Sequence, residues 1–202
     1  MSFFQTSKNL KLENEVGDLQ KAHNNEKKWS NMKKTIILSL LCANLFGFAE
    51  NLTTFSAHFV QTVVDDKKTT IKYNGDIKAK RPNMAMWNYT NPVKKEIYIN
   101  SSDLVIIEPE IEQVILKKVG NTIAFFEMLK NAKKVNNELY KATYEKLKID
   151  IHVKANKIDS ITYLDELENR VTIQFTNQVE NQKMDDKVFT AKIPADFDIV
   201  HQ

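Results

Sequence analysis

Cysteine is almost absent from this chain of 202 residues, and its single cysteine, Cys42, lies before residue 50. Residues 50–202 therefore cannot form disulfides, cysteine-ligated metal sites or a thiol nucleophile. This is compatible with an oxidising compartment. Glycine is also scarce, because only Gly75 and Gly120 follow residue 50. Asparagine, which tolerates left-handed backbone conformations, takes the place of glycine at many predicted turns.

A surplus of positive charge is missing from the same region. The whole chain carries a formal net charge of +3, but residues 1–49 hold seven lysines and four acidic residues. That leaves 22 basic and 22 acidic residues in 50–202, and the two signs are interspersed. No basic run with interleaved aromatic residues occurs, so the sequence predicts no nucleic-acid partner.

Motifs for catalysis are missing as well. There is no Gly-x-Ser-x-Gly elbow, P-loop or dinucleotide fingerprint. His58, His152 and His201 are far apart in the sequence without ligand-like spacing, which favours ordinary histidines over metal ligands. The carboxylate pairs lie at predicted turns, where they indicate solvated charge. We therefore expect no enzyme activity, no catalytic residue, no metal site and no cofactor.

Residues 32–49 have the three parts of a secretory signal peptide. Lys33-Lys34 is a positive start, residues 35–46 are mostly apolar, and small residues precede a cleavage site between Ala49 and Glu50. Residues 1–31 are polar, and we interpret them as a wrongly assigned or disordered extension. Residues 50–202 are then expected to form one domain in the periplasm.

Two alternatives to a cleaved signal peptide stay open. A membrane anchor would need roughly 20 apolar residues, more than residues 35–49 provide. A lipoprotein signal at Cys42 is disfavoured because the bulky Leu41 precedes it, where lipoprotein signals have a small residue.

Most of residues 50–202 alternate between apolar and polar side chains, the period of two that is typical of β-strands. Short, evenly spaced strands of this kind predict a meandering antiparallel sheet or barrel. A short helix at Asn51–Phe55 is expected to open the region. About eleven strands follow, at Ser56–Val64, Thr70–Lys80, Met84–Tyr89, Glu96–Asn100, Leu104–Glu108, Ile111–Lys117, Leu139–Tyr144, Leu147–Val153, Ile158–Leu164, Val171–Thr176 and Lys187–Ile193.

A helical segment from Gly120 to about Val135 interrupts the alternation. Apolar side chains cover most of the circumference of its first turns, whereas an ordinary surface helix has one apolar stripe. This pattern indicates apolar partners on more than one side. A core helix packed on one face of the sheet is the alternative. The residues concerned are Ile123, Ala124, Phe125, Phe126, Met128 and Leu129.

The stretch Gly75–Tyr89 contains the Arg-Pro pair at 81–82 and the only tryptophan after residue 50. Pro82 restricts the residue before it to extended geometry and marks a break between two strands. Arg81 offers a planar guanidinium with five donors at this fixed turn, which suggests a specific contact. An exposed arginine at an ordinary hairpin is the alternative.

With these features in order after a signal peptide, the chain resembles the LolA family of periplasmic outer-membrane lipoprotein carriers. The pieces that carry the resemblance are the opening Thr54–Gln61, Gly75-Asp76, the signature Lys80–Asn83 with Trp87 and Pro92, Pro109 with Glu112-Gln113, the start of the helix at Gly120–Thr122, and Ile193-Pro194. One departure is Ala85, where family members usually carry an aromatic residue.

The resemblance implies a mainly β fold, an incomplete and strongly curved antiparallel β-barrel with an α-helical lid over an apolar cavity. The Arg81 side chain would bond to the backbone of the lid and so help to keep the lid closed. Ala85, Trp87 and Tyr89 would line the cavity, and the lid would contribute Ile123, Phe125, Phe126 and Leu129.

The implied function is that of a monomeric periplasmic chaperone. It would take acylated lipoproteins from an inner-membrane lipoprotein-releasing ABC transporter and hand them to an outer-membrane lipoprotein acceptor. A periplasmic sensor or regulator that binds lipid or lipoprotein on the same fold is the main alternative. The outer-membrane acceptor itself and a lipid hydrolase are further alternatives, disfavoured by the context of Cys42 and by the missing nucleophile motif.

Overall fold

The structure is a computed structural model that describes residues 51–118, 125–144 and 147–201. The chain divides into two compact units, and the second of them, Gly47–Gln202, contains every element discussed below. The predicted signal peptide and its cleavage site at Ala49 and Glu50 lie outside the described residues, as does Ile123.

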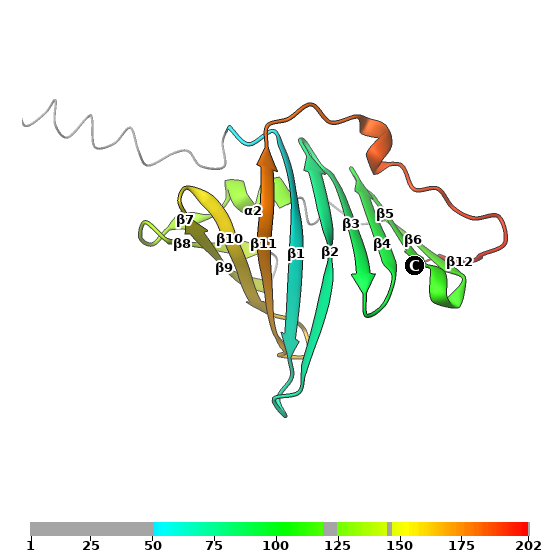
Figure 1. The fold of residues 1–202 in the computed structure, drawn as a ribbon, viewed down its shortest axis with the longest axis horizontal. Helices are drawn as coiled ribbons and strands as arrows, with labels where there is room; N and C mark the ends of the chain where they lie inside the picture. Colours follow the sequence, from blue (N-terminus) through cyan, green and yellow to red (C-terminus); the bar gives the residue numbers. More distant parts are fainter. Residues whose placement is uncertain (1–50, 119–124, 145–146, 202) are drawn as a thin grey trace, which may run out of the picture. The chain divides into compact units, whose positions relative to one another are not determined.

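Twelve strands form one sheet in the order β12-β6-β5-β4-β3-β2-β1-β11-β10-β9-β8-β7 (Figure 1). All neighbours pair antiparallel except β12 and β6, which run parallel. The strands are β1 Thr54–Val64, β2 Thr70–Lys80, β3 Met84–Asn91, β4 Lys95–Asn100, β5 Asp103–Glu108, β6 Gln113–Lys118, β7 Lys133–Lys134, β8 Leu139–Tyr144, β9 Leu147–Lys154, β10 Lys157–Leu164, β11 Arg170–Glu180 and β12 Asp198–His201.

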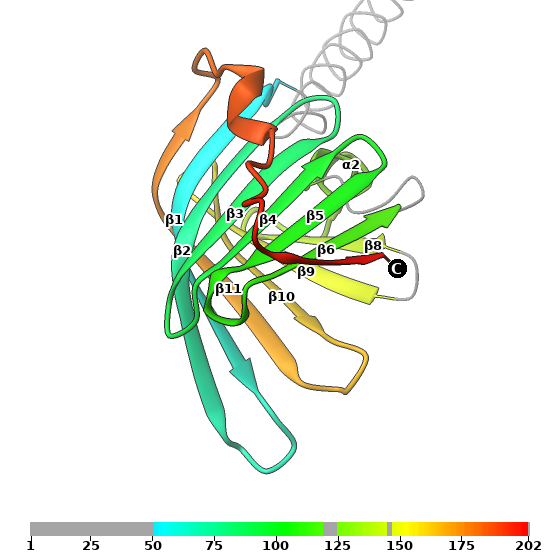
Figure 2. The ribbon, with the colours of Figure 1, turned by 90° about the vertical axis from the view of Figure 1, so that its right-hand side faces the viewer.

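The sheet curves strongly but does not close, because its first and last strands, β12 and β7, are not paired with each other (Figure 2). Among the described residues the only α-helix is α2, Phe125–Lys130, which lies on the concave side of the curve. The prediction of a mainly β, incomplete antiparallel barrel is therefore confirmed. The helical lid that the resemblance implies amounts to this one six-residue helix in the described part of the chain.

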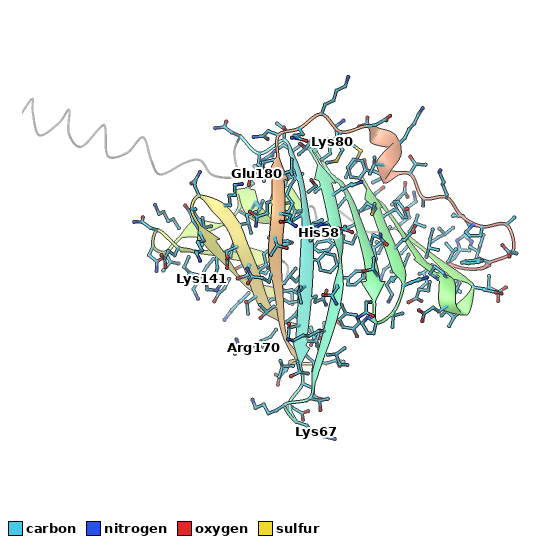
Figure 3. All side chains as sticks on the ribbon, viewed as in Figure 1. His58, Lys67, Lys80, Lys141, Arg170 and Glu180 are labelled. Carbon is cyan, nitrogen blue, oxygen red and sulfur yellow. The ribbon has the colours of Figure 1, made fainter. Side chains whose placement is uncertain are left out.

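Alternation along each strand sends the apolar side chains to the concave face, where they form one core with α2. The opposite, convex face carries polar and charged side chains, among them His58 and Lys80 (Figure 3). The concave core includes Phe55, Ala57 and Phe59 of β1, Ile77 and Ala79 of β2, and Val171, Ile173 and Phe175 of β11.

Three local predictions were wrong. No helix opens the region at Asn51–Phe55, because β1 begins at Thr54 and pairs with β2 from its first residue. The helix does not extend to Val135, since Lys133–Lys134 already forms β7 against β8. In both places pairing to a neighbouring strand prevails over the local helical pattern.

The third wrong prediction is the strand at Lys187–Ile193. The side chain of Asp185 accepts a hydrogen bond from the backbone N–H of Lys187 at 3.0 Å, which caps a 3₁₀-helix, η2, at Asp186–Phe189. The last strand, β12, lies further along the chain and pairs with β6. A second 3₁₀-helix, η1 at Pro109–Ile111, delays the start of β6 from the predicted Ile111 to Gln113.

Candidate functional site

The concave face holds an apolar cavity of about 180 Å³ beneath α2. Apart from the indole N–H of Trp87 and the hydroxyl of Tyr163, the side chains around it carry no oxygen or nitrogen atom. We call this space the apolar cavity; it is lined by Ala85, Trp87, Phe125, Met128, Leu147, Ile149, Ile161, Tyr163 and Ile173. Its walls therefore come from β3, β9, β10, β11 and α2.

Aromatic packing holds α2 against the sheet. The ring of Phe125 stacks on that of Phe55 with 5.0 Å between centroids, and Phe126 meets Phe125 edge-on at 5.4 Å. Phe126 and Leu129 are only 1% and 3% exposed, so the helix buries side chains on more than one side, as its sequence predicts. Burying each such side chain stabilises the closed arrangement by roughly 1.5–3 kcal/mol.

Arg81 lies where the start of β1, the end of β2 and α2 come together. Its Nε donates a hydrogen bond to the carbonyl oxygen of Leu52 at 2.6 Å, and its backbone N–H donates to that of Thr53 at 2.9 Å. The guanidinium carbon stands 5.0 Å from the centroid of the Phe126 ring, a cation–π contact worth about 0.5–2 kcal/mol. One side chain thus connects the start of the sheet to the helix.

A wall of aromatic rings bounds the apolar cavity on the side away from α2. Phe59 meets Trp87 edge-on at 5.1 Å and Tyr89 edge-on at 5.0 Å. Gly75 makes room for this wall, because a Cβ atom there would lie 2.7 Å from the Phe59 ring and closer still to the carbonyl oxygen of Asn88. Only glycine fits such a close approach of backbone and ring.

Beyond the wall, the same face continues into a second space of about 400 Å³. We call it the polar hollow; it is lined by Gln61, Val63, Tyr73, Tyr89, Val93, Lys95, Ile97 and Asp165. The Tyr89 hydroxyl donates to Oε1 of Gln61 at 2.8 Å. Burial, reinforced by the neighbouring Tyr163 and Tyr73, raises the pKa of Tyr89 well above its usual value, so its hydroxyl stays a neutral donor.

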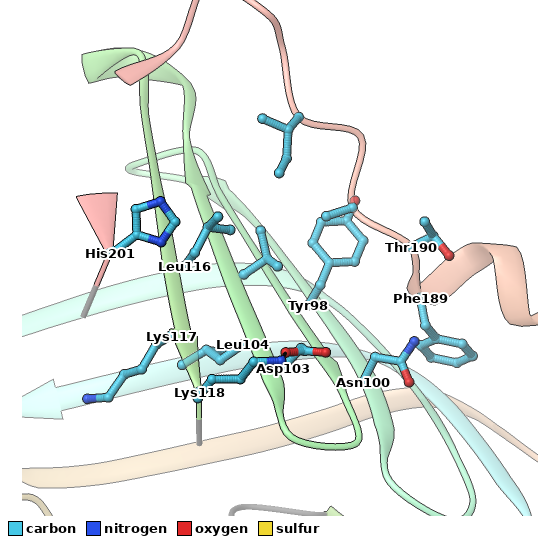
Figure 4. A pocket seen from close by; sticks show the side chains of 13 residues that line it. Tyr98, Asn100, Asp103, Leu104, Leu116, Lys117, Lys118, Phe189, Thr190 and His201 are labelled. Atoms are coloured by element: carbon cyan, nitrogen blue, oxygen red, sulfur yellow. Dashed lines mark hydrogen bonds and ion pairs between the residues drawn. The ribbon is translucent and has the colours of Figure 1, made fainter. Parts of the chain in front are cut away.

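A third space, of about 510 Å³, lies on the convex face beneath the C-terminal segment (Figure 4). Tyr98, Leu116 and Phe189 contribute apolar surface, while an Asp103–Lys118 ion pair and His201 make its rim polar. Burial raises the pKa of Tyr98 to about 12, with a further contribution from its hydrogen bond to Glu96. This space shares no lining residue with the apolar cavity.

The structure brings together part of the residue set expected from the sequence. Ala85, Trp87 and Phe125 line the apolar cavity, whereas Tyr89 lines the polar hollow. Phe126 and Leu129 are buried in the adjoining core and are not among the residues that line the cavity.

Sequence reasoning missed the distant wall of the cavity. It consists of Leu147, Ile149, Ile161, Tyr163 and Ile173. Their alternation in the sequence marks one apolar face on each of β9, β10 and β11. It does not reveal which strand lies opposite Trp87, because that depends on how far the sheet curves.

An open, curved sheet with one apolar face, a short helix over it and an internal cavity defines a half-barrel protein with an apolar cavity. The chain matches the model of the family described as outer membrane lipoprotein carrier protein LolA over residues 50–192. It therefore belongs to that family.

Curated relatives agree with this assignment. An outer-membrane lipoprotein carrier protein of Campylobacter jejuni is 38% identical over 170 residues, which cover 84% of this chain and 99% of the relative. One of Helicobacter pylori is 38% identical, with 76% and 83% covered. The crystal structure of a LolA superfamily protein from Nitrosomonas europaea superposes with a TM-score of 0.47 at 13% identity, over 70% of this chain and 91% of that one. The family assignment rests on the sequence matches.

Proposed function

We propose that this protein is a periplasmic chaperone for outer-membrane lipoproteins and binds their acyl chains on the concave face of the sheet. The observation that carries the proposal is the apolar cavity beneath α2, in a chain whose relatives are named lipoprotein carriers. The chemistry needed is burial of alkyl chains, for which the lining side chains are suited. No catalytic step is involved.

The volume of the cavity indicates how loading proceeds. Pockets for drug-sized ligands usually span about 300–1,000 Å³, so the cavity of about 180 Å³ is too small for acyl chains without rearrangement. Phe125 and Met128 of α2 form part of its wall. In the proposed mechanism α2 moves away from the sheet, and acyl chains take the place of its side chains.

The energetics of acyl chains favour direct transfer between proteins. Each methylene removed from water contributes about 0.8 kcal/mol, so exposing three chains of roughly fifteen methylenes together would cost on the order of 35 kcal/mol, as an upper bound. Release into water is therefore excluded. The proposed carrier, acting as a monomer, receives its cargo from an inner-membrane ABC transporter and passes it directly to an outer-membrane acceptor.

Arg81 is proposed to set the balance between loading and release. Through Leu52 and the Phe126 ring it stabilises α2 in the closed position. The apparent affinity of a ligand that binds only the open form is reduced in proportion to the fraction of molecules that are open. The closed state thus competes with the cargo, and this competition favours hand-off to an acceptor whose groove needs no such opening.

No helix within the described residues has the length and hydropathy required to cross a membrane.

The decisive experiment is a release assay, in which purified protein is added to energised spheroplasts that synthesise labelled lipoproteins. A stoichiometric soluble complex of lipoprotein and carrier is expected. If the lipoproteins stay on the membrane while a fluorescent fatty acid still binds, the carrier function is refuted and the lipid-binding site survives.

A further inference from the structure

The two spaces on the concave face differ in chemistry although they adjoin. The apolar cavity contains one hydroxyl and one indole N–H, whereas the polar hollow brings together an amide, two phenols, an ammonium and a carboxylate. Trp87 on one side of the wall and Tyr89 on the other are two residues apart on β3, or about 7 Å along the strand. A ligand that fills both spaces must change from apolar to polar within that distance.

The charged groups of the polar hollow are already engaged. Nζ of Lys95 forms an ion pair with Glu108 at 2.8 Å. The Asp165 carboxylate accepts hydrogen bonds from the backbone of Leu167 and from both the backbone and side chain of Asn169. These bonds hold the pKa of Asp165 below its usual value even though partial burial opposes them. The hollow therefore offers no unpaired positive charge to an anionic ligand, and the Asp165 carboxylate, which is hydrogen-bonded to neutral groups, repels one.

Neutral hydrogen-bond donors remain. Because Gln61 accepts from Tyr89 through Oε1, its amide nitrogen points its two N–H groups elsewhere. Neither that nitrogen nor the Tyr73 hydroxyl has a hydrogen-bond partner in the described part of the chain. Donors without charge suit carbonyl oxygens better than phosphates, which favour arginine or lysine.

We propose that the polar hollow binds the ester and amide carbonyls that join the acyl chains to the first residue of a lipidated protein. Gln61 and Tyr73 donate to these carbonyls while the chains lie across the aromatic wall in the apolar cavity. This inference rests on the proposed function and adds a second subsite to it. The hollow would distinguish a lipidated protein N-terminus from a bare fatty acid, and would do so without recognising an anionic headgroup.

The test compares three ligands: a synthetic diacylated lipopeptide, a fluorescent fatty acid with the same chain length, and a phosphatidylglycerol with the same chains. The variant combines Gln61→Met with Tyr73→Phe, which keeps the side-chain volumes and removes both donors. The matched control is Thr62→Val, which removes a hydroxyl from the next residue of β1, on the opposite face. Thermal melts establish that all variants are folded at the assay temperature.

The double variant is expected to bind the lipopeptide about tenfold more weakly, as for the loss of two hydrogen bonds. Fatty-acid affinity is expected to change less than twofold, and the Thr62→Val protein to match the wild type. Equal weakening for lipopeptide and fatty acid, or no weakening for either, would overturn the inference.

Two further outcomes identify what failed. In the first, phosphatidylglycerol binds the wild type as tightly as the lipopeptide does, and the variant weakens the binding of both ligands equally. The polar hollow would then bind the glycerol esters of any lipid. That result overturns the assignment to a lipidated protein. A wild type that binds none of the three ligands refutes the proposed function itself, and the inference with it.

Discussion

Two different segments cover the two faces of the sheet, and they are held there by different forces. On the concave face, α2 is held chiefly by ring packing, as between Phe125 and Phe55. On the convex face, the segment from Asn181 through η2 to β12 buries the Phe189 ring and is held in addition by directional bonds. Lys80 bonds to the Met184 carbonyl at 2.8 Å and to Asp186, and the Thr54 hydroxyl bonds to the Gln182 carbonyl at 2.8 Å.

This difference bears on which cover can be exchanged. Apolar packing is non-directional, so an alkyl chain can take the place of a phenylalanine ring without leaving a polar group unpaired. A hydrogen bond has no such substitute, because removing one partner leaves the other unsatisfied. In the proposed mechanism lipid can therefore replace α2, the concave cover. The segment from Asn181 to β12, the convex cover, is further secured by the pairing of β12 with β6 and stays in place.

The largest expected effect comes from removing one buried ring from each cover. Phe126 under α2 and Phe189 in η2 are both 1% exposed, so Phe126→Ala and Phe189→Ala should each lower the free energy of unfolding by about 3–5 kcal/mol. Urea denaturation measures both. If the comparison is right, only Phe126→Ala tightens the binding of a fluorescent fatty acid, because only that variant weakens the closed state.

A slightly smaller loss is expected for Gly75→Ala. The added Cβ would meet the Asn88 carbonyl and the Phe59 ring, and such overpacking costs about 1–3 kcal/mol. Displacement of Phe59 should also merge the apolar cavity with the polar hollow. Asn74→Ala, one residue earlier, is the control for denaturation and for lipopeptide binding. A Gly75→Ala protein with wild-type stability would contradict the close approach described here.

The neighbouring residues Arg81 and Lys80 allow a third comparison. Arg81 contacts α2 on the concave face, whereas Lys80 contacts the C-terminal segment on the convex face. Arg81→Leu should lower the free energy of unfolding by about 1–3 kcal/mol through loss of the Leu52 hydrogen bond and the Phe126 contact. It should also slow transfer of lipoprotein to an acceptor. Lys80→Leu should cost about 1 kcal/mol and leave transfer unchanged. If Arg81→Leu alters neither loading nor transfer, the role of Arg81 as a lid lock is wrong.

The smallest effect is a change in alkaline stability at the convex face. Tyr98 has a pKa of about 12 in the folded protein against a usual value of 10.0. Between these values the unfolded chain loses the phenolic proton and the folded chain keeps it. Ionisation of Tyr98 therefore leaves the free energy of unfolding undiminished below pH 10 and lowers it as the pH rises toward 12. Tyr98→Phe should reduce this loss, as followed by thermal melts across that range, and leave stability at neutral pH nearly unchanged.

Local alternation in the sequence predicted ten of the strands to within a few residues, because one face of each is dry. It could not place β12, whose partner in β6 lies about eighty residues earlier, nor recognise that Asp185 caps a helical turn. For the site, the Arg81, Ala85 and Trp87 stretch was visible in the sequence. The wall formed by Leu147, Ile149 and Ile161 was not, because curvature of the whole sheet brings it opposite Trp87.

An unclosed barrel has two free edges, and both are short. The outermost strands, β7 and β12, offer two and four residues for pairing, and β7 consists of Lys133 and Lys134. Short, lysine-bearing edges discourage the addition of strands from other molecules. The sheet can therefore stay open enough to admit cargo without serving as a template for polymerisation, even at high carrier concentration.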